Sequence, residues 1–120
     1  MKLEENSPLV DTFRLFMQAA DAVQKYYDST FYRKAGISTV KFNVLRALEM
    51  NGGRMTPSEI ARRVIRERHD ITTLIGRMKR DGYIEVEPNT TDKRSVYVIL
   101  TDKGREKLAQ AEPVFEEIVT

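Results

Sequence analysis

The sequence predicts a mainly α-helical protein with a small β-wing, in which a helix-turn-helix and a hairpin lie between long N-terminal and C-terminal helices. Three observations favour this class of fold. Apolar residues recur every three or four positions over residues 8–34, which indicates one long amphipathic helix. A short helical pattern and a longer one follow each other within residues 57–81. Two stretches of strand-like residues come next, at 83–87 and 95–100.

The composition limits what the chain can be. Its 120 residues suit a single domain with one modest core, and 41% hydrophobic with 32% charged residues is typical of a soluble globular protein. No apolar run is long enough to span a bilayer, and the first residues lack the apolar segment of a signal peptide, so we expect a cytoplasmic protein with no membrane partner. Without cysteine, with one histidine and without a Gly-rich phosphate loop, we expect no enzyme activity, no metal and no cofactor.

Positive charge is concentrated in the middle of the chain. Residues 54–94 hold 10 Lys and Arg against 7 Asp and Glu, whereas residues 95–120 hold 3 against 5. A basic middle segment is consistent with a surface that faces phosphate groups.

The N-terminal helix is predicted over residues 8–34. Ser7 can cap it and Pro8 suits its first position, while Gly36 ends it. Its apolar stripe has a heptad-like spacing and consists of Leu9, Phe13, Phe16, Ala20, Val23, Tyr27 and Phe31. Such a helix is about 40 Å long. One small domain can hardly cover so long a stripe, so we expect a second subunit.

The next elements lead into the helix-turn-helix. Ser38 can cap a second helix, which the turn residues 51–53 end, and residues 54–55 could form a strand stub. Thr56 and Glu59 have the spacing of a capping box, which indicates the start of a short helix.

The longer helix of the pair is predicted over residues 68–81. Its apolar face consists of Ile71, Leu74, Ile75 and Met78. Its polar faces, together with Arg66 just before it, carry Arg68, His69, Asp70, Thr72, Thr73, Arg77 and Arg80. Gly82 follows the last apolar position, where a left-handed C-cap is expected. A helix buried along one side and lined with donors along the other can enter a DNA major groove, but an ordinary amphipathic surface helix has the same pattern, so the flanking chain has to decide.

A β-hairpin follows directly. Residues 83–87 and 95–100 form its strands, and the polar loop 88–94 carries Lys93 and Arg94 near its tip. An idle surface hairpin would not need two cations at its tip, whereas a wing that contacts DNA would. With this hairpin beside the helix-turn-helix, DNA binding becomes the better interpretation.

A last helix is predicted over residues 102–119, capped by Thr101. Its apolar residues are Leu108, Ala111, Phe115, Ile118 and Val119. Pro113 lies inside it and should bend or break it.

The order of these elements resembles the MarR family of winged-helix transcriptional regulators. Asp92–Arg94 followed by Leu100–Gly104 is similar to the family's wing signature, D-x-R, a strand, then L-T-x-K-G. Residues 42–48 resemble the family's second helix, and residues 56–61 the start of its helix-turn-helix. The resemblance runs from about residue 9 to the end.

The resemblance implies one MarR-like domain over residues 1–120. Its parts would be dimerisation helices at 8–34 and 102–120 and a winged helix-turn-helix DNA-binding lobe at 38–100, with the wing at 83–100. Such a homodimer would bind a palindromic double-stranded DNA operator, usually as a repressor, and often responds to a small aromatic or phenolic effector. Tyr26, Tyr27, Tyr32 and Phe42 are candidates for lining an effector cavity, although plain core packing is an alternative for each.

The predicted DNA-binding residues follow from the same resemblance. Those around the recognition helix, which would enter the major groove, are Arg66, Arg68, His69, Asp70, Thr72, Thr73 and Arg77. Those of the wing are Asp92, Lys93 and Arg94, with Arg94 in the minor groove and Asp92 orienting it. The alternative function is a winged-helix module that binds another protein.

The sequence departs from the family pattern in two places. His69 and Asp70 stand where small hydroxyl residues are common; Asp70 could accept a hydrogen bond from cytosine or simply favour the helix N-terminus through the helix dipole. The family also usually continues into a further C-terminal helix, without which we expect a weaker dimer interface.

Overall fold

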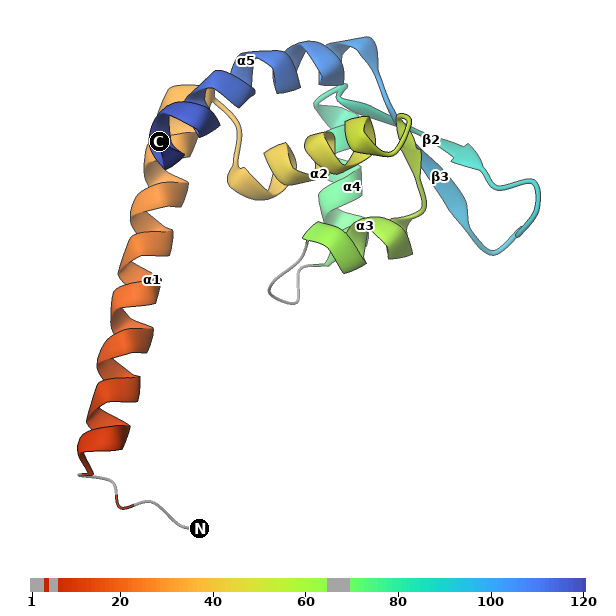
Figure 1. Ribbon diagram of the computed structural model, residues 1–120. Helices are drawn as coiled ribbons and strands as arrows, with labels where there is room; N and C mark the ends of the chain where they lie inside the picture. The colour runs from red at the N-terminus through yellow and green to blue at the C-terminus, as the bar shows by residue number, and fades with distance from the viewer. Residues whose placement is uncertain (1–3, 5–6, 65–69) are drawn as a thin grey trace.

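The computed structural model describes residues 4, 7–64 and 70–120. Its elements are α1 Pro8–Ala35, α2 Thr39–Met50, β1 Arg54–Met55, α3 Pro57–Val64, α4 Ile71–Arg80, β2 Ile84–Pro88, β3 Val96–Leu100 and α5 Asp102–Val119 (Figure 1). Helices α2, α3 and α4 and the sheet form one lobe, along which α5 runs toward the C-terminal end of α1 (Figure 1). The predicted class, mainly helical with a small β-wing, is confirmed.

Helix α1 has the predicted caps. The Ser7 hydroxyl accepts a hydrogen bond from the Val10 N–H at 3.2 Å, and Gly36, with φ 71°, donates its N–H to the Tyr32 carbonyl at 2.9 Å. These contacts end the helix one residue beyond the predicted range because only glycine enters the left-handed region without steric cost.

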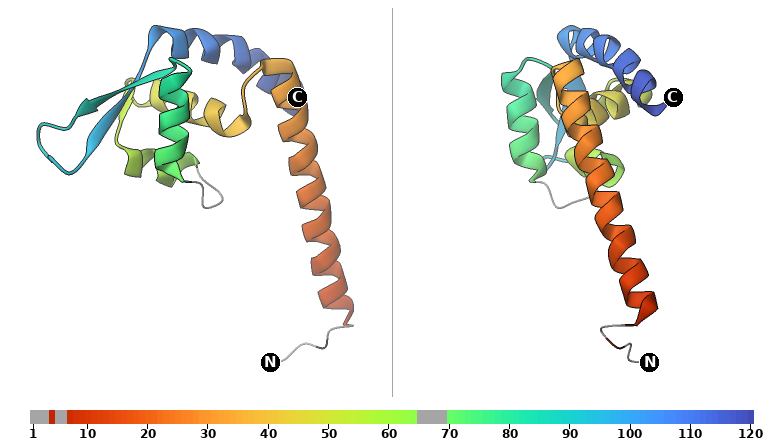
Figure 2. Two further views of the ribbon diagram at one scale, coloured as in Figure 1. Left: turned by 180° about the vertical axis from the view of Figure 1, so that it is seen from behind. Right: turned by 90° about the vertical axis from the view of Figure 1, so that its left-hand side faces the viewer.

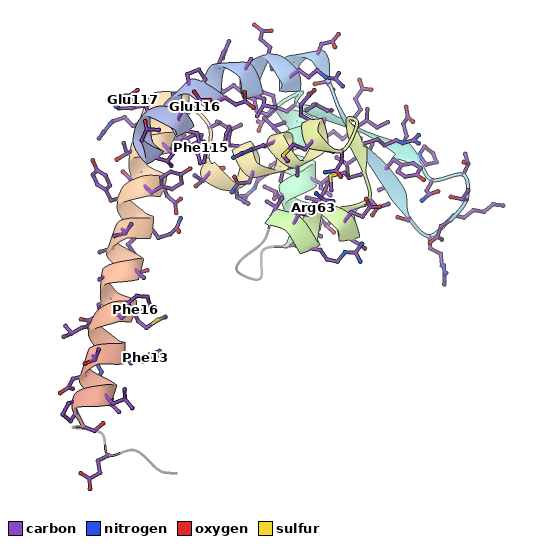
Figure 3. The ribbon with its side chains drawn as sticks, viewed as in Figure 1. Phe13, Phe16, Arg63, Phe115, Glu116 and Glu117 are labelled. Atoms are coloured by element: carbon purple, nitrogen blue, oxygen red, sulfur yellow. The ribbon has the colours of Figure 1, made fainter. Side chains whose placement is uncertain are left out.

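Most of α1 lies away from the lobe. Its N-terminal half extends into open space in all three views, and Phe13 and Phe16 lie on that half (Figures 1, 2 and 3). These two side chains are 65% and 68% exposed. The radius of gyration is 18.0 Å, whereas a compact domain of this length has about 14 Å. The predicted apolar stripe is therefore present but unpartnered over the described part of this one chain.

The core forms around α2. Phe42 is fully buried between Phe31 of α1 and Phe115 of α5, with ring centroids 4.9 Å and 5.6 Å away. This burial makes core packing, and not an effector cavity, the role of Phe42. The other fully buried large side chains come from all parts of the lobe and include Leu45, Leu48, Met55, Ile60, Met78, Ile84 and Val98.

The sheet has the strand order β1-β3-β2 and is antiparallel throughout. The predicted stub, β1, pairs Met55 with Val98, which in turn lies opposite Val86 of β2. Strand β2 extends one residue further than predicted and includes Pro88, opposite Val96. An edge strand tolerates proline because the side that faces away from its partner needs no N–H donor.

Thr101 joins the start of α5 to the end of α4. Its hydroxyl accepts from the Gly104 N–H at 3.0 Å and donates to the Gly82 carbonyl at 2.7 Å, while its own N–H donates to the Tyr83 carbonyl at 3.1 Å. A Cβ on Gly104 would lie 2.3 Å from the Tyr83 carbonyl oxygen. The glycine of the L-T-x-K-G signature is thus required by the close approach of two backbones.

The sequence predicts that Pro113 bends or breaks α5; the helix continues through this residue from Asp102 to Val119, so the break is contradicted. A proline removes only one intrahelical hydrogen bond, and the helix on both sides of it packs against other elements. Leu108 and Ala111 are buried before it, and Phe115 contacts Phe42 after it.

We predict opposite effects for two glycine substitutions. Gly104→Ala should lower the free energy of unfolding by about 1–3 kcal/mol because the new methyl group collides with the Tyr83 carbonyl. Gly76→Ala lies in the interior of α4, where no described residue outside the helix's own backbone comes within 4 Å of the added Cβ; it should raise the free energy of unfolding by up to about 1 kcal/mol. Urea unfolding at one fixed protein concentration measures both, and a Gly104→Ala variant as stable as the parent would contradict the close approach.

Candidate nucleic-acid interface

Helix α4 begins at Ile71, three residues later than predicted, and Asp70 is its N-cap. One oxygen of the Asp70 carboxylate accepts from the Thr72 N–H at 3.0 Å and the Thr73 N–H at 3.3 Å. The other accepts from the Thr73 hydroxyl at 2.7 Å. This carboxylate therefore caps the helix. The sequence pattern predicts Asp70 on a polar face of the helix, and that placement is wrong. Arg66, Arg68 and His69 lie outside the described residues.

These hydrogen bonds hold the pKa of the Asp70 carboxyl below its ordinary value. The Thr73 hydroxyl has the largest effect, followed by the Thr73 N–H; desolvation opposes them, and the Thr72 N–H adds to the lowering. Asp70 is consequently charged at neutral pH, and its charge lies at the positive end of the helix dipole.

The rest of α4 presents the predicted two faces. Leu74, Ile75 and Met78 are buried, whereas Thr72, Thr73, Arg77 and Arg80 are exposed. Among the described residues the Thr72 hydroxyl has no hydrogen-bond partner, but the Thr73 hydroxyl donates its hydrogen to Asp70. Thr72 can thus still donate to a base or phosphate, while Thr73 can only accept.

The C-terminal end of α4 is fixed from several sides. Gly82, with φ 82°, donates to the Lys79 carbonyl at 3.0 Å, and the Tyr83 N–H donates to the Met78 carbonyl at 3.1 Å. These two bonds form a Schellman motif, which confirms the predicted left-handed glycine. Asp81 also pairs with Lys41 of α2 at 2.8 Å, which ties α4 to the middle of the lobe.

The wing is a projecting hairpin formed by β2 and β3 (Figures 1 and 2). Near its tip, an Asp92 carboxylate oxygen accepts from the Arg94 backbone N–H at 3.0 Å and lies 3.5 Å from the Arg94 Nε. The Arg94 side chain is 94% exposed, and Lys93 beside it is exposed as well. The structure thus brings Asp92 and Arg94 together as the resemblance implied.

Asn89 in the wing loop is a residue that the sequence analysis missed. It is only 7% exposed, and its side-chain oxygen accepts from the Thr91 N–H at 3.0 Å, the Thr91 hydroxyl at 2.7 Å and the Asp92 N–H at 3.2 Å. These bonds form an Asx turn. Asparagine favours such turns because its side-chain oxygen reaches the N–H groups that follow it, so an Asn in a polar loop is the local signal that could have identified this one.

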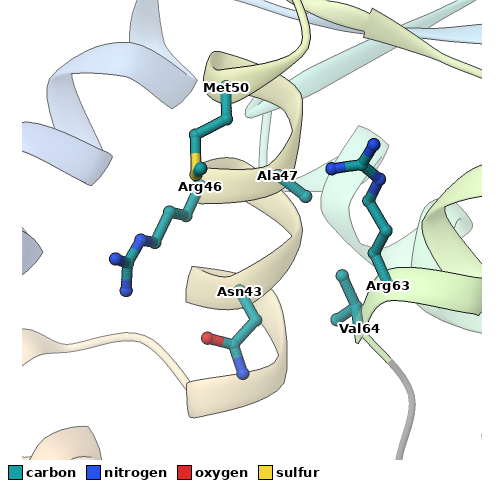
Figure 4. Close-up of a pocket in the computed structure, with 6 residues that line it drawn as sticks. All are labelled: Asn43, Arg46, Ala47, Met50, Arg63 and Val64. Atoms are coloured by element: carbon teal, nitrogen blue, oxygen red, sulfur yellow. The ribbon is translucent and has the colours of Figure 1, made fainter.

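Two hollows lie next to the interface. One, of about 410 Å³, is lined by Tyr32, Gly36, Ile37, Ser38, Lys41, Arg77, Asp81 and Tyr83. Arg77, predicted to contact DNA, thus borders this hollow, as does Tyr32. The other is an open groove of about 490 Å³ between α2 and α3, with Arg46 on one side and Arg63 on the other (Figure 4).

Two other tyrosines that the sequence analysis considered for an effector cavity line neither hollow. Tyr26 is exposed, whereas Tyr27 is half-buried and stacks on Phe31.

Two kinds of feature are absent from the described residues, a membrane-spanning helix and a cluster of metal ligands. No helix in this part of the chain is long and apolar enough to cross a membrane. In the same residues, no three His, Cys, Asp or Glu side chains gather as metal ligands would.

Comparison with known proteins gives consistent results. The sequence profile of the MarR family matches residues 35–95. The transcriptional activatory protein BadR of Rhodopseudomonas palustris is 38% identical over 105 residues, which cover 82% of this chain and 58% of BadR. The HTH-type transcriptional repressor YetL of Bacillus subtilis is 30% identical over 105 residues, which cover 85% of this chain and 63% of YetL. The chain therefore spans about three fifths of each of these relatives.

A solved structure is similar over nearly the whole chain. It is the crystal structure of Sco3205, a MarR family transcriptional regulator from Streptomyces coelicolor, in complex with DNA. Its sequence is 27% identical, the TM-score is 0.84, and the match covers 99% of this chain and 74% of Sco3205.

We predict that Asp70→Ala lowers the thermal unfolding midpoint and that Asp70→Asn, which keeps a cap acceptor, lowers it less. Because the folded-state pKa of Asp70 is depressed, its contribution to stability is complete above the unfolded pKa of about 3.9 and is lost as the pH falls through the lower folded value. The difference in midpoint between the parent and Asp70→Asn should therefore shrink as the pH is lowered from neutral toward 3. A difference that stays constant over this range would show that the carboxylate charge does not stabilise the cap.

Proposed function

The chain belongs to the MarR family, and on that premise we propose that it is a sequence-specific transcriptional regulator that binds double-stranded DNA. The observation that carries this proposal is the combination of a polar, solvent-exposed face on α4 with the exposed and oriented Arg94 on the wing. The similarity to Sco3205, which was crystallised with DNA, supports it further.

In the proposed complex α4 lies in the major groove and the wing reaches the adjacent minor groove. Thr72 is the hydroxyl of the N-terminal turn that has a hydrogen to donate to a base acceptor, since that of Thr73 is committed to Asp70. Arg94 would be attracted by the negative potential of a narrow minor groove and would read groove width more than a base code. Arg66, Arg68, His69 and Lys93 remain proposed contacts to DNA.

We propose that the working form is a homodimer on a palindromic operator. The exposed stripe on α1, which includes Leu9, Phe13, Phe16 and Val23, is too apolar and too long to face water in a lone subunit. A second copy of the same helix is a self-complementary partner for it. Two lobes related by a two-fold axis would then contact two half-sites related by the same axis.

We also propose that the protein is a repressor that an aromatic or phenolic acid releases from DNA. The hollow of about 410 Å³ combines Tyr32 and Tyr83 with the cation of Arg77, which suits an aromatic anion, and it borders the end of α4. Lys41 and Asp81 also line it, but they are paired with each other at 2.8 Å. BadR is an activatory protein and YetL a repressor, so the direction of regulation needs a test. Transcription in vitro from a promoter that carries an operator selected from random DNA tests both the repressor role and the response to an aromatic acid. Added protein should reduce the transcript and salicylate should restore it; an increased transcript, or no response to salicylate, would contradict the respective point.

The alternative is that the chain is a winged-helix module for another protein. Its basic face would then be merely solvated, and no duplex should bind even at low salt. Binding to DNA that falls steeply with rising salt favours the regulator.

We predict that Arg94→Ala weakens binding to an operator selected from random DNA by about 1–3 kcal/mol. The magnitude of the slope of log affinity against log salt should decrease by about one, because the variant has one fewer arginine in contact with DNA. Fluorescence polarisation with the labelled duplex measures both. Arg33→Ala is the matched control, since it removes an exposed arginine from the last turn of α1, at the opposite end of the molecule from the wing (Figure 1). Equal affinities of Arg94→Ala and Arg33→Ala would count against the wing assignment.

A second prediction concerns the dimer. Phe13→Glu and Phe16→Glu should shift the protein from dimer to monomer, because each places a charge in the apolar stripe. Leu15→Glu is the control: Leu15 is 65% exposed on the same helix but outside the stripe. Sedimentation velocity over a range of concentrations separates the two outcomes, and dimers of unchanged strength in the phenylalanine variants would place the interface elsewhere.

A further inference from the structure

We propose that Asn89 is a positioning residue of the wing, which acts on DNA by fixing the geometry of Arg94; this inference rests on the proposed function. Asn89 is 7% exposed although it lies in the loop of a projecting hairpin. A polar side chain buried at such a place needs hydrogen-bond partners. Its side-chain oxygen has three: the Thr91 N–H at 3.0 Å, the Thr91 hydroxyl at 2.7 Å and the Asp92 N–H at 3.2 Å.

A continuous chain of hydrogen bonds leads from Asn89 to Arg94. Asn89 holds the backbone of Asp92, and the Asp92 carboxylate accepts from the backbone N–H of Arg94 at 3.0 Å and lies 3.5 Å from its Nε. The Asp92 carbonyl accepts from the Ser95 N–H at 3.1 Å, and the Asn89 N–H donates to the Ser95 carbonyl at 3.4 Å. Asn89 thus closes the base of the loop, and it is linked to Arg94 through one intermediate residue, Asp92.

This arrangement matters because the Arg94 side chain itself is almost free. It is 94% exposed, so no packing restricts it, and its direction depends on Asp92 and on the backbone of the loop. A loop that is ordered before DNA arrives does not have to be ordered at the binding step, which favours affinity. Without Asn89 the same contacts would have to form together with the complex.

The type of residue fits this role. The site needs a short side chain with one oxygen that accepts several hydrogen bonds, which Asn and Asp both provide. Asparagine does this without adding a negative charge beside the phosphates that the wing approaches. Asn89→Asp should accordingly preserve the order of the loop.

The competing explanation is that Asn89 only supports the hairpin and has no particular connection to Arg94. A double-mutant cycle separates the two, because effects of residues that act through each other are not additive. Asn89→Ala should weaken operator binding about tenfold, a loss of the size expected for one groove contact. Adding Asn89→Ala to Arg94→Ala should cause less than about a twofold further loss, and the salt slope of Asn89→Ala should approach that of Arg94→Ala.

Thr90→Ala is the matched control, since Thr90 is exposed in the same loop and its side chain makes no hydrogen bond to any residue that the structure describes. It should bind operator as the parent does. If the losses from Asn89→Ala and Arg94→Ala multiply in the double variant, or if Asn89→Ala binds as tightly as the parent, the proposal is overturned.

A measurement without DNA keeps this test separate from the proposed function. Amide hydrogen exchange of the free protein should be faster at Asp92–Ser95 in Asn89→Ala than in the parent, and near the parent rate in Asn89→Asp. Exchange that Asn89→Ala does not change would overturn the positioning role even if the parent binds operator tightly. Conversely, a parent that binds no duplex while the exchange results hold would refute the proposed function and leave the structural role of Asn89 standing.

Discussion

The contact between the end of α4 and the start of α5 holds together the two elements of the proposed DNA interface, α4 and the wing. Thr101 caps α5 through the Gly104 N–H and at the same time donates its hydroxyl hydrogen to the Gly82 carbonyl, just beyond α4. Its own N–H bonds the Tyr83 carbonyl, where the wing begins. The Lys103 ammonium adds a bond to the Asp81 carbonyl at 2.7 Å. One short segment thus ends a helix, starts another and aligns the first strand of the wing with the last.

The starts of the helices that follow Ser or Thr were the most predictable part of the fold because the chemistry that sets them is local. Ser7, Ser38 and Thr101 cap the helices that they precede, since a hydroxyl three residues before a free N–H satisfies it wherever the helix packs. The start of α4 was placed wrongly because polar residues before Ile71 fit a helical face and a turn equally well. The break that Pro113 could have caused does not occur, since sequence shows the lost hydrogen bond but not the packing that compensates for it.

The candidate interface was predictable in part. The pairing of Asp92 with Arg94 followed from the signature, because two residues of opposite charge two positions apart in a tight loop lie within reach of each other. The role of Asp70 could not be decided from the sequence, since both of its alternatives use the same carboxylate and only the fold determines which donors surround it. Asn89 could not be recognised for a related reason. Its burial distinguishes it from other polar loop residues, and that burial depends on the folded conformation of the hairpin.

The aromatic contacts of Phe42 have a mechanical consequence. Phe31 and Phe115 grip this residue from the two terminal helices, so α1 and α5 cannot swing against α2 without opening the core. Each subunit of the proposed dimer would then behave as a rigid body, and the angle between the two α1 helices would set the separation of the two α4 helices. Such a protein would tolerate changes of sequence within a half-site better than the insertion of a base pair between half-sites.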